Sequence, residues 1–108
     1  IYKKVEKQPE YPGGNVRLME YLQKNLKYPQ EAKDKKIEGT VYIEFIVDKK
    51  GHVVNPQIKR GIPNGEDLNK EALSIISRME RTYFLWIPAR HKGKDVGARM
   101  VLPIQFTL

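Results

Sequence analysis

The most regular alternation of apolar and polar residues lies between Gly39 and Lys59. Its apolar members recur at every second position: Val41, Ile43, Phe45 and Val47. A period of two sends alternate side chains to opposite faces of a strand, so the stretch predicts a β-strand with one apolar face. The polar segment that follows ends at Gly51 and is typical of a short hairpin loop.

A second strand is predicted after this loop, with Val54, Pro56 and Ile58 in phase on one face. Pro56 has no N–H to donate to a ladder, which favours a position at the edge of the sheet. A lone two-stranded hairpin is not stable in water. The rest of the chain is therefore expected to cover its apolar face or to extend the sheet.

The run from Val96 to Leu108 alternates in the same way. One predicted face holds Ala98, Met100, Leu102, Ile104, Phe106 and Leu108, and the other holds Arg99, Val101, Pro103, Gln105 and Thr107. Pro103 leaves one side of this strand unpaired or introduces a bulge, so this strand too is expected at an edge. Edges at both ends predict the strand order 2-1-3.

Three helices are predicted around this sheet. The first runs from Asn15, as its cap, to about Asn25, and its expected apolar stripe is Val16, Met19, Leu22 and Leu26, widened by Leu18 and Tyr21. Tyr28-Pro29 ends that helix, and Pro29 is expected as the first residue of a short helix to about Lys35, with Ala32 packed close to the sheet. The main helix is placed at about 68–80 with Asp67 as its cap, and its stripe is Leu68, Ala72, Ile75, Ile76 and Met79.

The remaining segments read as connections. Residues 1–14 contain two prolines and two glycines within Gln8–Gly14, which predicts an extended arm pinned to the body by Tyr11. Thr82–Ile87 is aromatic-rich, and its Trp86 is interpreted as core or rim packing, with a binding platform as the alternative. Arg90–Asp95 is expected to form a solvated basic turn. The predicted fold is α+β: an arm over residues 1–14 and one domain over residues 15–108, with a small three-stranded antiparallel sheet and its helices on one face.

Composition narrows the function. The 108 residues carry a net charge of +7, no cysteine and no apolar run of the roughly 20 residues that a transmembrane helix needs. The basic residues are spread along the chain, without a nucleic-acid-binding motif, so nucleic acid is not expected as a partner. Two explanations of the positive charge remain: it keeps the protein soluble, or it binds an anionic surface of the cell envelope.

No catalytic or metal-binding set is found in the sequence. His52 follows a predicted hairpin turn and His91 lies in a predicted basic loop, so neither is placed on a helix face beside a second metal ligand. Ser74 and Ser77 lie on the polar side of the main helix without a nucleophile motif. A non-enzyme without cofactor or metal is therefore expected. The last strand remains as the candidate site, because an exposed edge is a template for another extended chain. The alternative is an ordinary edge protected by Pro103 and Arg99.

An ordered set of residues resembles the C-terminal domain of TonB, the periplasmic energy transducer of Gram-negative bacteria. It starts with Tyr28-Pro29-x-x-Ala32, Ile37-Glu38-Gly39, Val41, Phe45, Val47, Gly51 and Val53, and continues with Leu68, Ala72, Trp86, Pro88, Gly93-Lys94 and Pro103-Ile104-x-Phe106. The lead-in Pro9–Gly14 is similar to the Bacteroidetes branch of the family. Two positions depart from it: six residues separate Met79 from Trp86 where a short link is usual, and Asn25 stands where the family has a glutamine that touches the receptor peptide.

The resemblance implies a receptor-binding domain in the periplasm, anchored to the inner membrane by a segment upstream of Ile1. It would capture the TonB box of outer-membrane transporters by strand addition and draw on the proton-motive force through an ExbB–ExbD-like complex. The implied receptor-peptide site is Arg99, Met100, Val101, Leu102, Pro103, Ile104 and Gln105, with Asn25 as a further candidate. Two alternatives stay open: the sensor domain of a BlaR/MecR-like membrane metallopeptidase, and a basic peptidoglycan-binding module. A homodimer also stays open.

Overall fold

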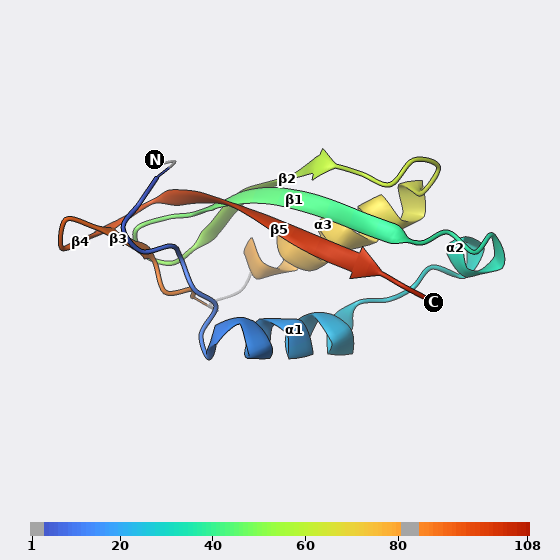
Figure 1. The fold of residues 1–108 in the computed structure, drawn as a ribbon, viewed down its shortest axis with the longest axis horizontal. Coiled ribbons are helices and arrows are strands. Elements are labelled where there is room, and N and C mark those ends of the chain that lie inside the picture. The colour runs from blue at the N-terminus through green and yellow to red at the C-terminus, as the bar shows by residue number, and fades with distance from the viewer. Residues whose placement is uncertain (1–3, 81–84) are drawn as a thin grey trace.

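Strand β1 (Gly39–Val47) is the middle strand of an antiparallel sheet in the computed structural model, which describes residues 4–80 and 85–108. It pairs on one side with β2 (Val53–Arg60) and on the other with β5 (Ala98–Phe106), giving the order β2-β1-β5 (Figure 1). The predicted order 2-1-3 is confirmed, with β5 as the third strand of this sheet.

The core lies between the helices and one face of this sheet. The predicted apolar faces of β1 and β5 both point into it, and the largest side chains buried there from the two strands are Phe45, Phe106, Ile43, Ile104, Val41 and Val47. The opposite face of β5 is exposed at alternate positions, from Arg99 to Gln105. The period-two pattern therefore predicted the buried face of both strands correctly, except for Leu108, which lies beyond the end of β5 and is 58% exposed.

Helix α3 (Glu66–Glu80) packs against β1 and β2, as the sequence predicted. All five residues of its predicted stripe are buried: Leu68, Ala72, Ile75, Ile76 and Met79. The helix begins earlier than predicted, because the carbonyl of Gly65 already accepts a bond of 2.9 Å from the N–H of Asn69. Asp67 therefore lies in the first turn and is not the cap.

Helix α1 (Gly14–Asn25) differs from its prediction in both its cap and its buried face. Its cap is Gly13, whose φ of 91° takes the chain from the arm into the helix, and Asn15 lies inside the first turn. Leu18 and Leu22 are buried, whereas Val16 is 74% and Met19 51% exposed. The helix therefore turns the Leu18–Leu22 side to the core, because leucines at i and i+4 form a sufficient stripe without Val16 and Met19.

Helix α2 (Gln30–Asp34) is a single turn with Ala32 buried, as predicted. Pro29 precedes the helix rather than starting it, because its ψ of 139° is extended. Its carbonyl still accepts the N–H of Lys33 at 3.1 Å, so the proline acts as the cap.

Val54, Pro56 and Ile58 were predicted to share one face of the second strand, but they do not lie on one face of β2. Between the pairs Ile46–Val54 and Glu44–Gln57, one residue of β1 faces two of β2, and Asn55 has a φ of 54° there. Such a bulge adds one residue and reverses the faces beyond it. Val54 consequently lies opposite Ile46 on the open face, while Ile58 lies opposite Ile43 on the core face and is 40% exposed.

The predicted basic turn at Arg90–Asp95 is instead a small hairpin of β3 (Ala89–His91) and β4 (Lys94–Val96). Lys92 and Gly93 both have positive φ, of 51° and 77°, as a tight two-residue hairpin turn requires. Arg90 and Asp95 face each other across the hairpin and form an ion pair of 2.8 Å. The polar composition of Arg90–Asp95 predicts a loop, whereas the pairing of β3 with β4 makes the segment a hairpin.

The N-terminal arm is pinned to the body, as expected. Lys7 exchanges two backbone bonds of 3.0 Å with Arg90, and Glu10 exchanges bonds of 2.9 and 2.8 Å with Ile87. Tyr11 is buried and meets Trp86 edge to face at 5.4 Å. Trp86 in turn packs on Phe45 at 5.5 Å, which confirms its core position.

Tyr83 and Phe84, the other aromatic residues of the predicted segment Thr82–Ile87, lie outside the described residues.

Across residues 4–80 and 85–108, no helix is both long and apolar enough to cross a membrane.

Candidate functional site

The candidate site is the outer edge of β5. The strand pairs with β1 over its whole length, from Phe106 opposite Gly39 to Ala98 opposite Val47. Within the described part of the chain, no strand pairs with its other edge. The backbone groups along that edge are therefore available to an incoming strand.

Pro103 determines which backbone groups those are. It lies opposite Tyr42, and without an N–H it cannot take part in a pair that exchanges two hydrogen bonds. Hydrogen-bonded and non-bonded pairs alternate along an antiparallel ladder, so Leu102–Ile43 and Ile104–Val41 must be the bonded pairs. The N–H and C=O groups of Val101 and Gln105 consequently point outward, as does the C=O of Pro103.

The side chains along the predicted site divide between two faces. Arg99, Val101, Pro103 and Gln105 are exposed, Met100 and Leu102 are half-buried, and Ile104 is buried. Arg99 reaches across the open face and pairs with Glu44 through Nε and Oε1 at 3.2 Å. The even-numbered side chains of the site thus pack toward the core. The odd-numbered side chains lie on the exposed face of the sheet, and the outward backbone groups lie along the free edge.

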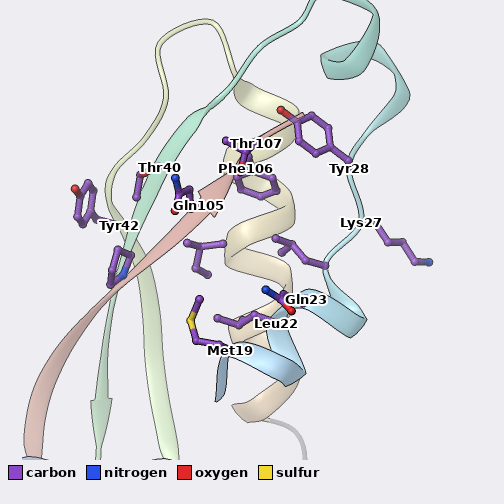
Figure 2. Close-up of a pocket in the computed structure, with 13 residues that line it drawn as sticks. Met19, Leu22, Gln23, Lys27, Tyr28, Thr40, Tyr42, Gln105, Phe106 and Thr107 are labelled. Carbon is purple, nitrogen blue, oxygen red and sulfur yellow. The ribbon is translucent and has the colours of Figure 1, made fainter. Parts of the chain in front are cut away.

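A groove of about 530 Å³ follows the outer edge of β5 at its C-terminal half. Figure 2 shows its lining: β5 contributes Gln105 and Phe106, while Met19, Leu22 and Gln23 come from α1. Tyr28 and Tyr42 lie at its sides. Free backbone groups and a hollow lined by apolar side chains therefore occur together at this edge.

The groove carries little charge. Lys27 is the one charged residue in its lining, and Figure 2 shows this side chain pointing away from β5. Burial raises the pKa of Tyr28, and the nearby Glu38 carboxylate raises it further, so the hydroxyl stays protonated and donates to the carbonyl of Ile37. The site is thus suited to backbone pairing and apolar contact rather than to proton transfer.

The structure does not bring Asn25 to this groove. Its Nδ2 donates to the carbonyl of Tyr21 at 2.8 Å, and the residue lines a separate cavity with Tyr11 and Arg17.

In the described residues, no group of three or more His, Asp or Glu side chains could hold a metal ion.

Sequence reasoning missed the contribution of α1. Met19 was assigned to the apolar stripe that faces the core, and Gln23 was assigned no role. The available signal was an excess of apolar residues: Leu18 and Leu22 already complete a core-facing stripe, which leaves Met19 for another surface.

Comparison with known proteins identifies a family that the chain matches. The family model described as Gram-negative bacterial TonB protein C-terminal matches residues 24–108. No curated protein sequence matches the chain. Among solved structures, the solution structure of the TonB C-terminal domain of Helicobacter pylori is similar in fold, with a TM-score of 0.63 and 20% identity over 86% of this chain and 78% of that one.

The match spans most of the chain, including all three strands of the main sheet and helices α2 and α3. Members of this family are non-enzymatic periplasmic domains that transduce energy to TonB-dependent outer-membrane receptors. The chain belongs to the TonB C-terminal domain family.

Proposed function

We propose that this domain captures a short extended segment of a TonB-dependent outer-membrane transporter, its TonB box, as an added strand on the outer edge of β5. The observation that carries the proposal is the alternation fixed by Pro103, which directs the backbone groups of Val101 and Gln105 toward the groove side of the strand. Capture would couple the inner-membrane proton-motive force, delivered through an ExbB–ExbD-like complex and an N-terminal membrane anchor, to nutrient uptake.

Backbone pairing alone gives this site a modest affinity. About four or five hydrogen bonds at about 0.5–1.5 kcal/mol each yield roughly 2–7 kcal/mol. Ordering a flexible peptide costs about 2–5 kcal/mol, which cancels most of that gain. Side-chain contacts in the groove must supply the remainder, and the resulting affinity suits a domain that engages and releases its transporters.

Amide hydrogen exchange tests the proposal, with synthetic peptides copied from the periplasmic N-terminal segments of TonB-dependent transporters of the same organism. In the free domain, the outward N–H groups of Val101 and Gln105 should exchange quickly, whereas the inward ones of Leu102 and Ile104 should be protected. Adding a peptide should protect the outward pair and leave the inward pair unchanged.

A scrambled peptide is the control and should protect neither pair. Shift changes confined to the Asp48–Val53 turn or to α3, with residues 99–105 silent, would rule out strand addition at β5. Protection of Val101 and Gln105 that rises with protein concentration in the absence of peptide would instead indicate edge-to-edge pairing of two copies.

A further inference from the structure

Helix α1 forms the wall of the groove that faces β5, and it precedes the family match except for its last two residues. The match begins at residue 24, whereas the helix spans Gly14–Asn25. Leu18 and Leu22 fix it to the core, and Tyr11 in the preceding arm packs against Tyr21 at 6.1 Å. The wall is therefore anchored at several points.

The exposed apolar residues of α1 differ in what they face. Val16 and Met19 are three residues apart and both largely exposed, but only Met19 lines the groove. Figure 2 shows Met19 and Gln23 on the α1 side of the groove, across from Gln105 and Phe106. A methionine is flexible and adapts to varied apolar partners, which fits a contact with an incoming side chain.

Strand geometry determines which side chains would reach this wall. A strand added to β5 continues the sheet, and its alternate side chains point to opposite faces. One set points to the open face that carries Tyr42 and Val101. The other set points to the helix layer, as Leu102 and Ile104 do, and meets α1.

The lining also determines the chemistry of the side chain that fits. None of the lining residues is acidic, and the one cation, Lys27, points away from the strand. A charge inserted between α1 and β5 would lose water without gaining an opposite charge, which is costly. An uncharged apolar side chain meets Met19, Leu22 and Phe106 instead.

We propose that α1 is the second wall of the peptide site, and that Met19 and Gln23 select an uncharged, apolar side chain on the inward face of a strand paired with β5. This inference rests on the proposed function, since it needs the peptide to pair with β5. It adds that residues before the family match determine which transporter segments are accepted.

A matched pair of variants tests the inference by calorimetric titration with the tightest-binding transporter peptide from the exchange experiment. Met19→Lys should weaken binding about tenfold or more, because a charge enters an apolar contact, whereas Val16→Lys should change it less than about twofold. Met19→Leu should restore binding to within about threefold of the wild type, because it conserves volume and apolarity. Both lysine variants alter exposed side chains and should keep the wild-type unfolding midpoint.

A charge swap identifies the peptide residue that Met19 contacts. Peptides with a single Asp at each position in turn should include one that the wild-type domain rejects and the Met19→Lys variant accepts, because the new ammonium then pairs with the carboxylate. The Val16→Lys variant should reject the same peptide.

The Val101→Pro variant distinguishes failure of the inference from failure of the proposed function. Equal, unchanged binding by Met19→Lys and Val16→Lys, with binding abolished by Val101→Pro, would overturn the role of α1 and leave strand addition intact. Unchanged binding by Val101→Pro as well would overturn both.

Discussion

Pro103 lies directly opposite Tyr42 in the β1–β5 ladder, and this pair sets the direction of every backbone group along β5. A proline at a bonded position would leave a carbonyl of the central strand without its donor. At the non-bonded position that it occupies, its missing N–H falls on the open edge. The same residue therefore preserves the folded sheet and determines which groups an incoming strand can use.

Prolines introduced at adjacent positions of β5 should have opposite effects. Val101→Pro removes an outward N–H, so transporter-peptide binding should weaken tenfold or more while the domain stays folded. Leu102→Pro removes an N–H bonded to Ile43 and should cost about 3 kcal/mol or more of unfolding free energy. Peptide titration and urea unfolding followed by circular dichroism measure the two effects. Similar losses of stability in both variants would show that the alternation is wrong.

Phe45 should be among the most costly residues to truncate. It is 1% exposed and packs on Trp86, so Phe45→Ala should lower the unfolding free energy by about 3–5 kcal/mol through lost burial and a cavity. Val16→Ala, at a 74% exposed position, should change it by less than about 0.5 kcal/mol. Urea unfolding of both variants is the measurement, and an unchanged midpoint for Phe45→Ala would refute the predicted core.

Alanine variants of Gly51 and Gly93 distinguish the cost of backbone strain from the cost of a steric clash. Both have positive φ, of 94° and 77°, so alanine at either should cost about 1–2 kcal/mol. A Cβ at Gly51 would also lie 2.2 Å from the carbonyl oxygen of Trp86, whereas one at Gly93 meets nothing within 4 Å. Thermal unfolding should therefore show Gly51→Ala to be less stable than Gly93→Ala by a further 1–3 kcal/mol or so. Equal midpoints would mean that the turn relaxes away from Trp86.

Asp48 makes stability depend on pH. Partial burial by itself raises the pKa of Asp48, but the N–H groups of His52 and Lys50, which donate to its carboxylate, and the nearby His52 ring together bring the pKa below its ordinary value of 3.8. A depressed pKa stabilises the fold above the unfolded-state pKa, and this contribution is lost as the pH falls through the folded-state pKa.

Asp48→Ala should therefore be less stable than the wild type at pH 7, by about 1–2 kcal/mol, and the difference should shrink below about pH 4. Unfolding in urea across this pH range is the measurement. Asp34→Ala, which removes an exposed carboxylate bonded to the Gln30 side chain, is the control and should show a smaller difference. A difference for Asp48→Ala that stays constant down to pH 2 would exclude the carboxylate as its source.

The net charge of +7 should contribute little to peptide capture, because the groove itself is nearly uncharged. Raising salt from about 50 to 200 mM should change transporter-peptide affinity less than about threefold. DNA is the contrasting ligand, and any binding to it should fall steeply over the same range. A steep salt dependence for the peptide would indicate that surface lysines hold it.

The sheet and α3 could be predicted from the sequence because one requirement dominates each element. β1 and β5 bury one face, so the period of two indicates the right residues, and the stripe of α3 faces the core without competition. The edge position of β5 followed from the same pattern together with Pro103, and its use as a peptide site stays a prediction. These are the places where local pattern and tertiary burial agree.

The misses occur where a second requirement changes the pattern. Asn55 inserts a residue into β2 and moves Ile58 to the opposite face from Val54, which periodicity alone cannot show. Helix α1 has more apolar residues than its core contact needs, and only the packed structure shows that Met19 is left for the groove. The hairpin at Arg90–Asp95 depends on positive φ at Lys92, a residue type that seldom signals such a turn.

The edge-to-face contacts of Trp86 provide the domain with an intrinsic optical reporter. It is the only tryptophan in the chain, and its ring contacts both Tyr11 of the arm and Phe45 of the core. Its fluorescence therefore responds both to release of the arm and to loss of the core. If the arm detaches before the sheet unfolds, the emission should change in two steps, whereas a concerted transition should give one.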